Sequence, residues 1–571
     1  MNTWRKLADR FDQEPRLSLW AIGIWVALNV IQAIFTELFH DEAYYWMFSQ
    51  HLAWGYFEHP PMIALMIRTG TLLSDTELGV RLFPILCNAL ALLLILDMAG
   101  PRKRLLLLVL LFSVFEVHIG GFFAAPDAPL SLFATLYFYM LRRYLANDGW
   151  ANVFLFALVI SAMLYSKYHG AMVLFFTICS FPALLTRRSF WLLGITSVVL
   201  CLPLLLHLYG QNFGTFAFHL GDRVHKPWSP EFTLNFLGGQ ILIAGPISGL
   251  ILLPAAFLYK TKDRWERALK WSLAGVLLFL FAMSFRTWIE ANWSASIFVP
   301  TLVLAFKYIS EYERWERWAW RIALPGIVVL LLFRIHLVVP FVPGLNTLRN
   351  EVHGWKEWAH QIEEIAGDEP VLFYNSYAQP SKYTYYTRKL AYPLNNFLYH
   401  TTQYEAWGIE DSLQGRPAWY FTTEGGCTSC DTVRTATGKL FYYQRINPFY
   451  SYPYLRMDIV SPPAEVVSGQ DVELDVQIRS LKGEIRFDRN PEFPVSLVVF
   501  VMQKGVWKYY LPAFVDMTPM KIGPEGLVQR IKIPCKMPPG DYEWYVTYSS
   551  GWMHPGMVSH FVPFRVIAPS K

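Results

Sequence analysis

Long apolar stretches in the first 340 residues limit the possible fold more than any other feature of this sequence. Stretches of about 17 to 25 mostly apolar residues, long enough to cross a hydrocarbon core roughly 30 Å thick, recur from Leu17 to Phe341. Only 16% of the residues are charged, whereas soluble domains carry about 25%. The chain therefore has to fold in contact with lipid.

These stretches predict about eleven transmembrane helices. The first is longer than the core of a signal peptide and is followed by Asp41 and Glu42 instead of a small-residue cleavage pattern, so we interpret it as a membrane anchor. The eleven predicted spans lie near residues 17–39, 79–98, 105–123, 127–143, 151–166, 168–186, 189–209, 236–259, 269–287, 293–310 and 320–341.

Basic residues are distributed unequally between alternate loops. With a cytoplasmic amino terminus, the inside loops hold 20 Lys and Arg residues and the outside loops before the tail hold 6. Because Lys and Arg collect on the cytoplasmic side, this orientation is predicted, and the odd number of spans places the carboxy-terminal tail outside. The net charge of +5 therefore reflects topology, and we predict no nucleic-acid partner.

From about Asn350 the sequence changes to the pattern of a soluble protein, with a predicted helix at 355–365 and a short apolar strand at 371–374. Cys427 and Cys430 form a C-x-x-C in this tail, where a local disulfide is favoured over zinc because no second ligand pair is near. Alternating strands support an immunoglobulin-like β-sandwich at the end of the chain, at 472–478, 495–503 and 542–548. The predicted domains are a transmembrane domain at 1–345, a small α/β domain at 346–453 and the β-sandwich at 454–571.

The unusual polar residues all fall in the outside loops. Asp41 and Glu42 stand where the first span leaves the lipid, and two interpretations are open: solvated charges at a helix end, or a pair that faces a cavity or partner. Glu58 and His59 before a Pro-Pro in the same loop, and Arg81 after it, favour the second. Chemistry at the outer face is predicted. The loop itself, residues 40–68, is long enough for two helices along the membrane surface, and Pro60 and Pro61 can start the second.

Further outside turns add polar residues to the same face. Asp127 in APDAP is on its own equally well explained as a helix N-cap, and Lys167 in SKYHG as a side chain that reaches to the membrane surface. The remaining turns are FHLGDRVHKPW at 218–228 and EANW at 290–293. Capping and anchoring alone do not explain so many polar residues on one face.

These motifs resemble the GT-C glycosyltransferases of the protein O-mannosyltransferase and aminoarabinose (lipid A) transferase type. The resemblance rests on DEAYYW from Asp41, GYFEHPP from Gly55, Arg81, PDAP before the fourth span and SKYHG after the fifth, and it covers about 340 residues. It implies a polytopic GT-C membrane fold with a carboxy-terminal region outside. It also implies a polyprenyl-phosphate-sugar donor, a lipid, protein or glycan acceptor, and inversion at the anomeric carbon.

The chemistry of such a transfer requires a base for the acceptor and positive groups for the leaving phosphate. Asp41 fits the base, and Glu42 and Asp127 are the other candidate catalytic carboxylates. The candidate phosphate-binding residues are His59, Arg81, Lys167 and Arg223.

The sequence departs from the lipid A transferase pattern at two positions, where Tyr44 and His59 replace basic residues. In that enzyme type a carboxylate and a histidine of the outside loops bind zinc, and the matching positions are Glu58 and His219. The resemblance thus implies a divalent metal, zinc or magnesium, although two side chains do not complete a zinc site.

We therefore predict an integral protein of the bacterial inner membrane whose catalytic face and carboxy-terminal domains lie outside the cytoplasm. Two alternatives remain open: a transporter or flippase, and a polysaccharide polymerase or ligase that uses a lipid carrier. A transporter would carry ionisable residues near mid-span and on both faces, whereas here they cluster on one face.

Overall fold

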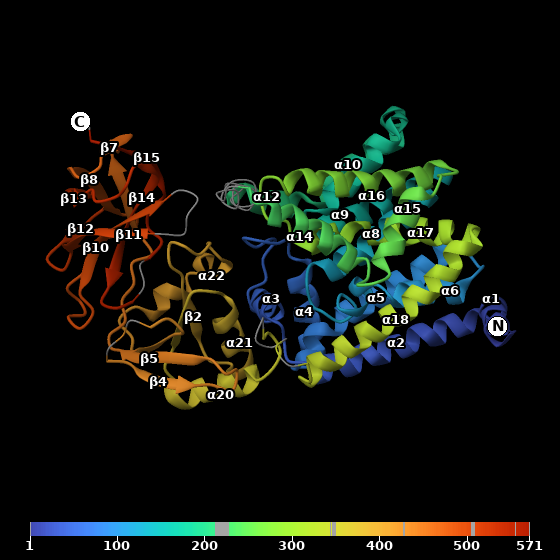
Figure 1. The fold of residues 1–571 in the computed structure, drawn as a ribbon, viewed down its shortest axis with the longest axis horizontal. Coiled ribbons are helices and arrows are strands. Elements are labelled where there is room, and N and C mark those ends of the chain that lie inside the picture. The colour runs from blue at the N-terminus through green and yellow to red at the C-terminus, as the bar shows by residue number, and fades with distance from the viewer. Residues whose placement is uncertain are drawn as a thin grey trace. The chain divides into compact units, whose positions relative to one another are not determined.

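A computed structural model describes residues 2–211, 228–342, 344, 350–425, 427, 429–503, 509–553 and 556–569. The chain divides into two compact units, Met1–His353 and Gly354–Lys571. The first is helical and the second contains the sheets (Figure 1).

The described part of the first unit consists of helices joined by short connections. In chain order they are α1 (Asn2–Gln13), α2 (Pro15–Phe35), α3 (His40–Gln50), α4 (Met62–Leu73), α5 (Glu77–Ala99), α6 (Arg104–Phe112), α7 (Phe115–His118), α8 (Asp127–Ala146), α9 (Trp150–Ser166), α10 (Gly170–Ser180), η1 (Pro182–Thr186), α11 (Arg188–Leu200), α12 (Leu202–Gly210), α14 (Pro230–Ile243), α15 (Gly249–Leu258), α16 (Arg264–Met283), η3 (Ala291–Ile297), α17 (Phe298–Glu311) and α18 (Glu313–Val338).

Several of these helices are long and apolar enough to cross a membrane. Among the described residues, α2, α5, the continuous segment Ala291–Glu311 and α18 meet this criterion, and α11 with α12 forms a fifth candidate that is bent by 53°. Large apolar side chains such as Trp20, Ile24 and Leu72 are about 70% exposed, as expected of a surface that lipid covers. The prediction of a membrane protein is confirmed, and the count of eleven spans stays a prediction.

Two predicted spans are interrupted at the same place in the fold. The span at 105–123 is split into α6 and α7, and the span at 236–259 into α14 and α15. The Ser248 hydroxyl donates to the carbonyl of Ser113 (2.8 Å), and a Cβ at Gly245 would lie 2.4 Å from that carbonyl. A glycine with φ of 122° is therefore required at position 245. The hydroxyl group at the second break satisfies the carbonyl group at the first.

The first outside loop folds into two helices, as predicted. α3 begins at His40, and α4 begins at Met62, directly after Pro60 and Pro61. The segment between them folds back on α3, because the Tyr56 hydroxyl donates to the carbonyl of Phe48 (3.0 Å). The motifs of this loop are thus held against α3.

The second unit begins with a mixed five-stranded sheet of order β2-β1-β3-β5-β4. β1 pairs in parallel with β2 and β3, and the remaining pairs are antiparallel. Trp358 of α20 is fully buried against this sheet. The elements are α20 (Trp355–Ala366), β1 (Val371–Tyr374), α21 (Ala378–Thr387), β2 (Ala391–Leu394), α22 (Gln403–Ala406), η4 (Ile409–Leu413), β3 (Ala418–Thr422), β4 (Asp431–Arg434) and β5 (Leu440–Ile446).

The rest of the unit has two larger sheets, of order β11-β10-β14-β15-β7 and β13-β8-β6, and a small pair, β12-β9. Their inward side chains form one core, in which the rings of Trp544 and Phe564 stack with centroids 4.0 Å apart. The strands are β6 (Leu455–Val460), β7 (Glu465–Val467), β8 (Asp471–Ser480), β9 (Ile485–Arg486), β10 (Val495–Gln503), β11 (Tyr509–Asp516), β12 (Lys521–Ile522), β13 (Leu527–Pro534), β14 (Gly540–Ser550) and β15 (Val562–Ile567).

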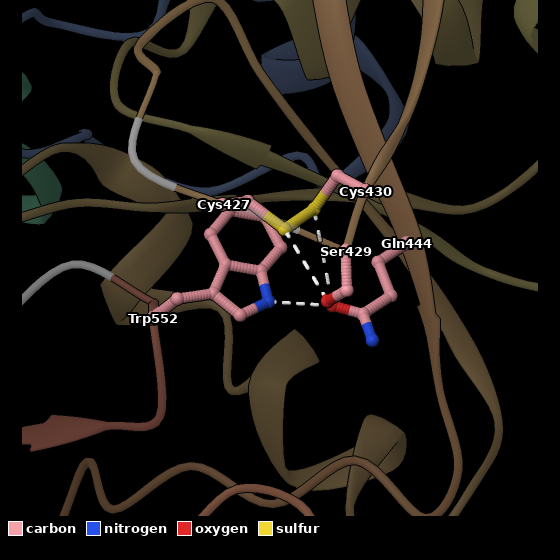
Figure 2. Close-up of a disulfide and its surroundings, with 5 residues drawn as sticks. All are labelled: Cys427, Ser429, Cys430, Gln444 and Trp552. Carbon is pink, nitrogen blue, oxygen red and sulfur yellow. Dashed lines mark hydrogen bonds between the residues drawn. A yellow bond between two sulfur atoms is a disulfide. The ribbon is translucent and has the colours of Figure 1, made fainter.

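The predicted disulfide between Cys427 and Cys430 is present (Figure 2). Beside it, the indole of Trp552 donates to Gln444 Oε1 (2.6 Å), which ties the loop after β14 to β5. Cys535 is a buried, unpaired thiol in the sandwich core.

A buried carboxyl group in η4 makes the stability of the second unit depend on pH. Burial raises the pKa of Glu410 from its ordinary value of 4.5 to about 6, and the Tyr392 hydroxyl donates to this carboxyl group (2.9 Å). Because the folded state binds the proton more tightly, this contribution to stability is complete below about pH 4.5. This stabilising contribution is lost as the pH rises through about 6, the pKa of Glu410 in the folded state.

We expect the loss to reach at most ~2 kcal/mol and to vanish in Glu410→Gln. Hydrogen exchange of η4 between pH 4.5 and 7 in the full chain measures it, after correction for the intrinsic pH dependence of exchange. An equal slope in wild type and variant would contradict the role of Glu410.

Candidate active site around α3

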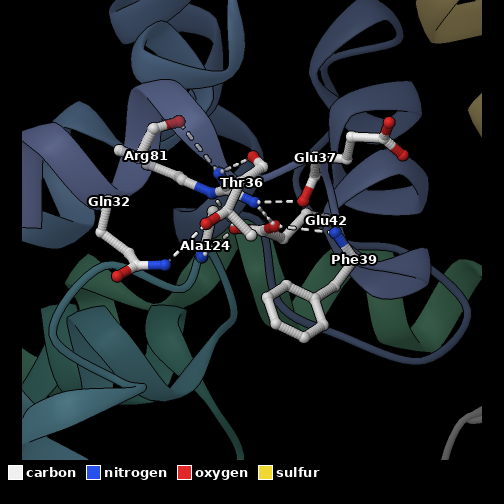
Figure 3. Close-up of polar contacts among 8 residues, drawn as sticks. Gln32, Thr36, Glu37, Phe39, Glu42, Arg81 and Ala124 are labelled. Carbon is white, nitrogen blue, oxygen red and sulfur yellow. Dashed lines mark hydrogen bonds and ion pairs between the residues drawn. The ribbon is translucent and has the colours of Figure 1, made fainter. Parts of the chain in front are cut away.

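A fully buried ion pair lies at the junction of α2 and α3 (Figure 3). Arg81 of α5 donates to both oxygens of Glu42, and neither side chain has any exposed surface. Arg81 also donates to the carbonyls of Ala33 (3.0 Å), Thr36 (2.6 Å) and Glu37 (2.9 Å). The end of a helix leaves carbonyls without intrahelical partners, and Arg81 supplies them at the end of α2.

The Glu42 carboxylate likewise accepts several hydrogen bonds. Besides Arg81, it accepts the backbone N–H of Phe39 (2.9 Å), which caps the start of α3, and the N–H of Ala124 (2.8 Å) from the loop before α8. All five N–H groups of Arg81 are likewise directed at protein oxygens. In this arrangement Glu42 and Arg81 hold three segments together. A role for Glu42 in proton transfer, or for Arg81 in phosphate binding, would require the pair to separate.

Asp41 precedes this pair in the first turn of α3 and is partly exposed. Burial, and then the negative charges of Asp41, Asp127 and Glu58, raise the pKa of Tyr45 well above its usual range. These three carboxylates therefore lie near Tyr45, although they come from separate parts of the sequence. His59 belongs to the same cluster, because its Nε2 lies 3.1 Å from the Tyr45 hydroxyl.

Asp127 and Lys167 form a second buried ion pair, with a distance of 2.7 Å between carboxylate and ammonium. The other oxygen of Asp127 accepts the side-chain amide of Asn292 (2.9 Å). The interpretation of Asp127 as an N-cap is wrong, because Pro126 occupies that position and Asp127 is the first residue of α8. The interpretation of Lys167 as a surface anchor is also wrong, because this side chain is only 5% exposed.

The structure describes only part of the predicted metal site. Both oxygens of Glu58 accept the Tyr44 hydroxyl, at 2.9 and 3.1 Å. His219, its expected partner, and the predicted phosphate ligand Arg223 lie outside the described residues. Within the described ranges, no group of three His, Cys, Asp or Glu side chains is placed to hold a metal ion.

The structure adds two residues that the sequence interpretation did not single out. Tyr45 lies in the DEAYYW motif, and its hydroxyl group lies 3.1 Å from His59 Nε2. Asn292 lies in the EANW turn, 165 residues beyond its partner Asp127. Position in a motif was the available signal for both, because their roles depend on contacts between distant segments.

Comparisons with known proteins agree with this architecture. Residues 58–207 match the family model described as dolichyl-phosphate-mannose-protein mannosyltransferase. The lipid A galacturonosyltransferase RgtD of Rhizobium johnstonii is 28% identical over 381 residues, which are 62% of this chain and 78% of that protein.

Solved structures of ArnT from Cupriavidus metallidurans have the same fold. The apo structure aligns with a TM-score of 0.57 at 12% identity, over 74% of this chain and 97% of ArnT. The structure with undecaprenyl phosphate aligns with a TM-score of 0.55 at 13% identity, over 75% of this chain and 98% of ArnT. The fold, the family match and the curated relative agree with the motifs quoted above, and the chain is an integral membrane glycosyltransferase with a GT-C fold.

Proposed function

We propose that the protein transfers one sugar from a polyprenyl-phosphate carrier to lipid A or another glycan acceptor. The reaction takes place at the outer face of the bacterial inner membrane, with inversion at the anomeric carbon. The observation that carries the proposal is a cluster around α3: His59 contacts the Tyr45 hydroxyl, Glu58 accepts from the neighbouring Tyr44, and Asp127, paired with Lys167, lies near enough to help raise the pKa of Tyr45. The name of RgtD supports lipid A as acceptor, and the ArnT complex supports undecaprenyl phosphate as carrier.

In the proposed reaction Asp41 accepts the proton of the acceptor hydroxyl as its oxygen attacks the anomeric carbon. The bond between that carbon and the phosphate oxygen breaks, and polyprenyl phosphate leaves. Lys167 and His59 stabilise the charge that develops on the phosphate, and Asp127 holds Lys167 in place. Glu42 and Arg81 fix the backbone on which Asp41 stands.

We also propose that Glu58 and His219 hold a divalent cation, zinc or magnesium, with donor phosphate or water as further ligands. The contact of Glu58 with the neutral Tyr44 hydroxyl fits this role, because such a partner orients a carboxylate and leaves its charge for a cation. A bound ion would supply additional positive charge for the leaving phosphate. Glu58→Gln is expected to lower the metal content of the purified protein, measured by plasma mass spectrometry. An unchanged metal content, or none in wild type, would contradict the site.

Comparative mass spectrometry tests the function in cells. A deletion strain is expected to lose one sugar from lipid A or a surface glycan and to accumulate the corresponding polyprenyl-phosphate sugar. Complementation with the wild-type gene restores the sugar, and complementation with Asp41→Asn does not. Unchanged lipid A, glycans, glycoproteins and carrier lipids in the deletion strain would contradict the proposal.

The proposed orientation is tested by labelling single cysteines with a membrane-impermeant maleimide. Leu52→Cys and Gly425→Cys, both at exposed positions, should be labelled in intact spheroplasts. Arg102→Cys and Arg188→Cys, exposed at the opposite helix ends, should react only after the membrane is opened. The reverse pattern would place the site in the cytoplasm.

A further inference from the structure

A second buried arginine lies in α18, the last described helix of the membrane unit. The side chain of Arg334 is almost fully buried, and it donates to the amide oxygens of Asn29 (2.8 Å) and Gln32 (3.2 Å) in α2. It also donates to the carbonyl of His118 (3.1 Å), the last residue of α7. The Arg334 side chain thus connects α18 to α2 and to α7.

No ion pair within the described residues includes Arg334, and its hydrogen-bond partners are neutral oxygens. A buried guanidinium group without an ionic partner is costly, and well-packed apolar residues often stabilise a buried site as well as charged ones do. Stability alone therefore explains Arg334 poorly. Its cost points to a function.

The contacts of Arg334 continue toward the candidate site along two routes. In α2, the Gln32 amide donates to the Thr36 hydroxyl (2.7 Å), and the Thr36 carbonyl accepts from Arg81 (Figure 3). In the loop after α7, both guanidinium groups lie against the ring of Phe122. The ring centroid is 5.1 Å from Cζ of Arg334 and 5.5 Å from Cζ of Arg81. Two residues later, Ala124 donates to Glu42. Both routes end at Glu42, beside Asp41.

We propose that Arg334 is a positioning residue for the transfer reaction. It fixes the end of α2 and the segment from His118 to Ala124, so that Glu42 and Arg81 hold the start of α3, and Asp41 with it, in one place. A displacement of about 1 Å at a reacting group costs up to about 10²-fold in rate. The inference rests on the proposed function where it concerns Asp41, and on the contacts alone where it concerns the α2–α3 junction.

A double-mutant cycle tests the coupling. Arg334→Met removes the guanidinium group. Thr36→Val removes the hydroxyl that accepts from the Gln32 amide, and it keeps the backbone carbonyl that accepts from Arg81. Arg321→Met is the matched control, because it makes the same change at an exposed position of α18. Arg334→Lys keeps the charge and serves as the conservative variant.

The first readout is substrate-free hydrogen exchange of residues 39–44 and 122–126. We expect faster exchange in Arg334→Met and Thr36→Val, partial recovery in Arg334→Lys and wild-type exchange in the control. The second readout is transfer of the sugar from the polyprenyl-phosphate donor that accumulates in the deletion strain to its acceptor, per folded enzyme. Here kcat should fall about 10-fold in either variant, with donor KM within about twofold, and the double variant should be no worse than the poorer single variant.

Unchanged exchange at the α2–α3 junction, losses that multiply in the double variant, or an effect confined to KM would overturn the proposal. If Arg334→Met does not fold, Arg334→Lys and its double variant with Thr36→Val complete the cycle. If Asp41→Asn keeps its activity while the cycle shows coupling, the role of Asp41 fails and the positioning of the junction stands. The two proposals thus fail separately.

Discussion

Replacing Asp41 by asparagine is expected to lower the transfer rate by about 10²-fold or more. The amide has the shape of the carboxylate but does not accept the proton of the acceptor hydroxyl. Because Asp41 is partly exposed, and the adjacent Glu42 carries the buried ion pair, the fold should not change. Binding of the donor should therefore remain close to wild type.

The measurement is the initial rate of transfer in nanodiscs, together with binding of undecaprenyl phosphate. Asp75→Asn is the matched control, since it makes the same chemical change at an exposed residue between α4 and α5. Retention of half the wild-type rate by Asp41→Asn would remove Asp41 from the role of base. Asp127 would then be the next candidate, because its carboxylate already has Lys167 as partner.

Replacing Glu42 by glutamine is expected to destabilise the membrane unit by about 3–5 kcal/mol, the cost of leaving one member of a buried ion pair without its partner. The effect should be at the upper end, because the new amide would also direct N–H groups toward Arg81 or toward the N–H groups of Phe39 and Ala124. The free energy of unfolding in detergent, or the unfolding midpoint where unfolding is irreversible, measures the loss.

Two controls separate this ion pair from ordinary ones. Glu14→Gln breaks an exposed pair with Arg10 and should cost less than about 1 kcal/mol. The double variant Glu42→Leu and Arg81→Met should be less destabilised than the sum of its single variants, because neither charge is then left alone. A small effect of Glu42→Gln, or additive single effects, would show that the pair does not hold the α2–α3 junction.

Features that depend on neighbouring residues were predictable from the sequence. The strand at Val371–Tyr374 has the predicted bounds, and α20 differs from its prediction by one residue, because apolar periodicity and turn residues define them locally. The disulfide follows from the spacing of Cys427 and Cys430. The two helices of the first outside loop follow from Asp41 and Glu42 at one start and Pro60 and Pro61 at the other.

Features that depend on contacts between distant segments were not predictable. The break at Ser113 depends on Ser248, 135 residues later, and a continuous apolar run does not reveal it. The charges at the outer face were visible, but not their pairing. Arg81 resembles a phosphate ligand until Glu42 and three carbonyls account for its donors. Arg334 is one polar residue in an apolar span, and its partners lie in α2 and α7, far away in the sequence.

The most direct test of the proposed reaction is its stoichiometry in proteoliposomes that contain the purified protein, undecaprenyl-phosphate sugars and lipid A. We expect one undecaprenyl phosphate to be released for each sugar joined to the acceptor, with inversion at the anomeric carbon. Asp41→Asn should stop the sugar transfer and the release of undecaprenyl phosphate together. Passage of the intact carrier lipid across the bilayer without cleavage, or release of undecaprenyl pyrophosphate in place of the monophosphate, would contradict it.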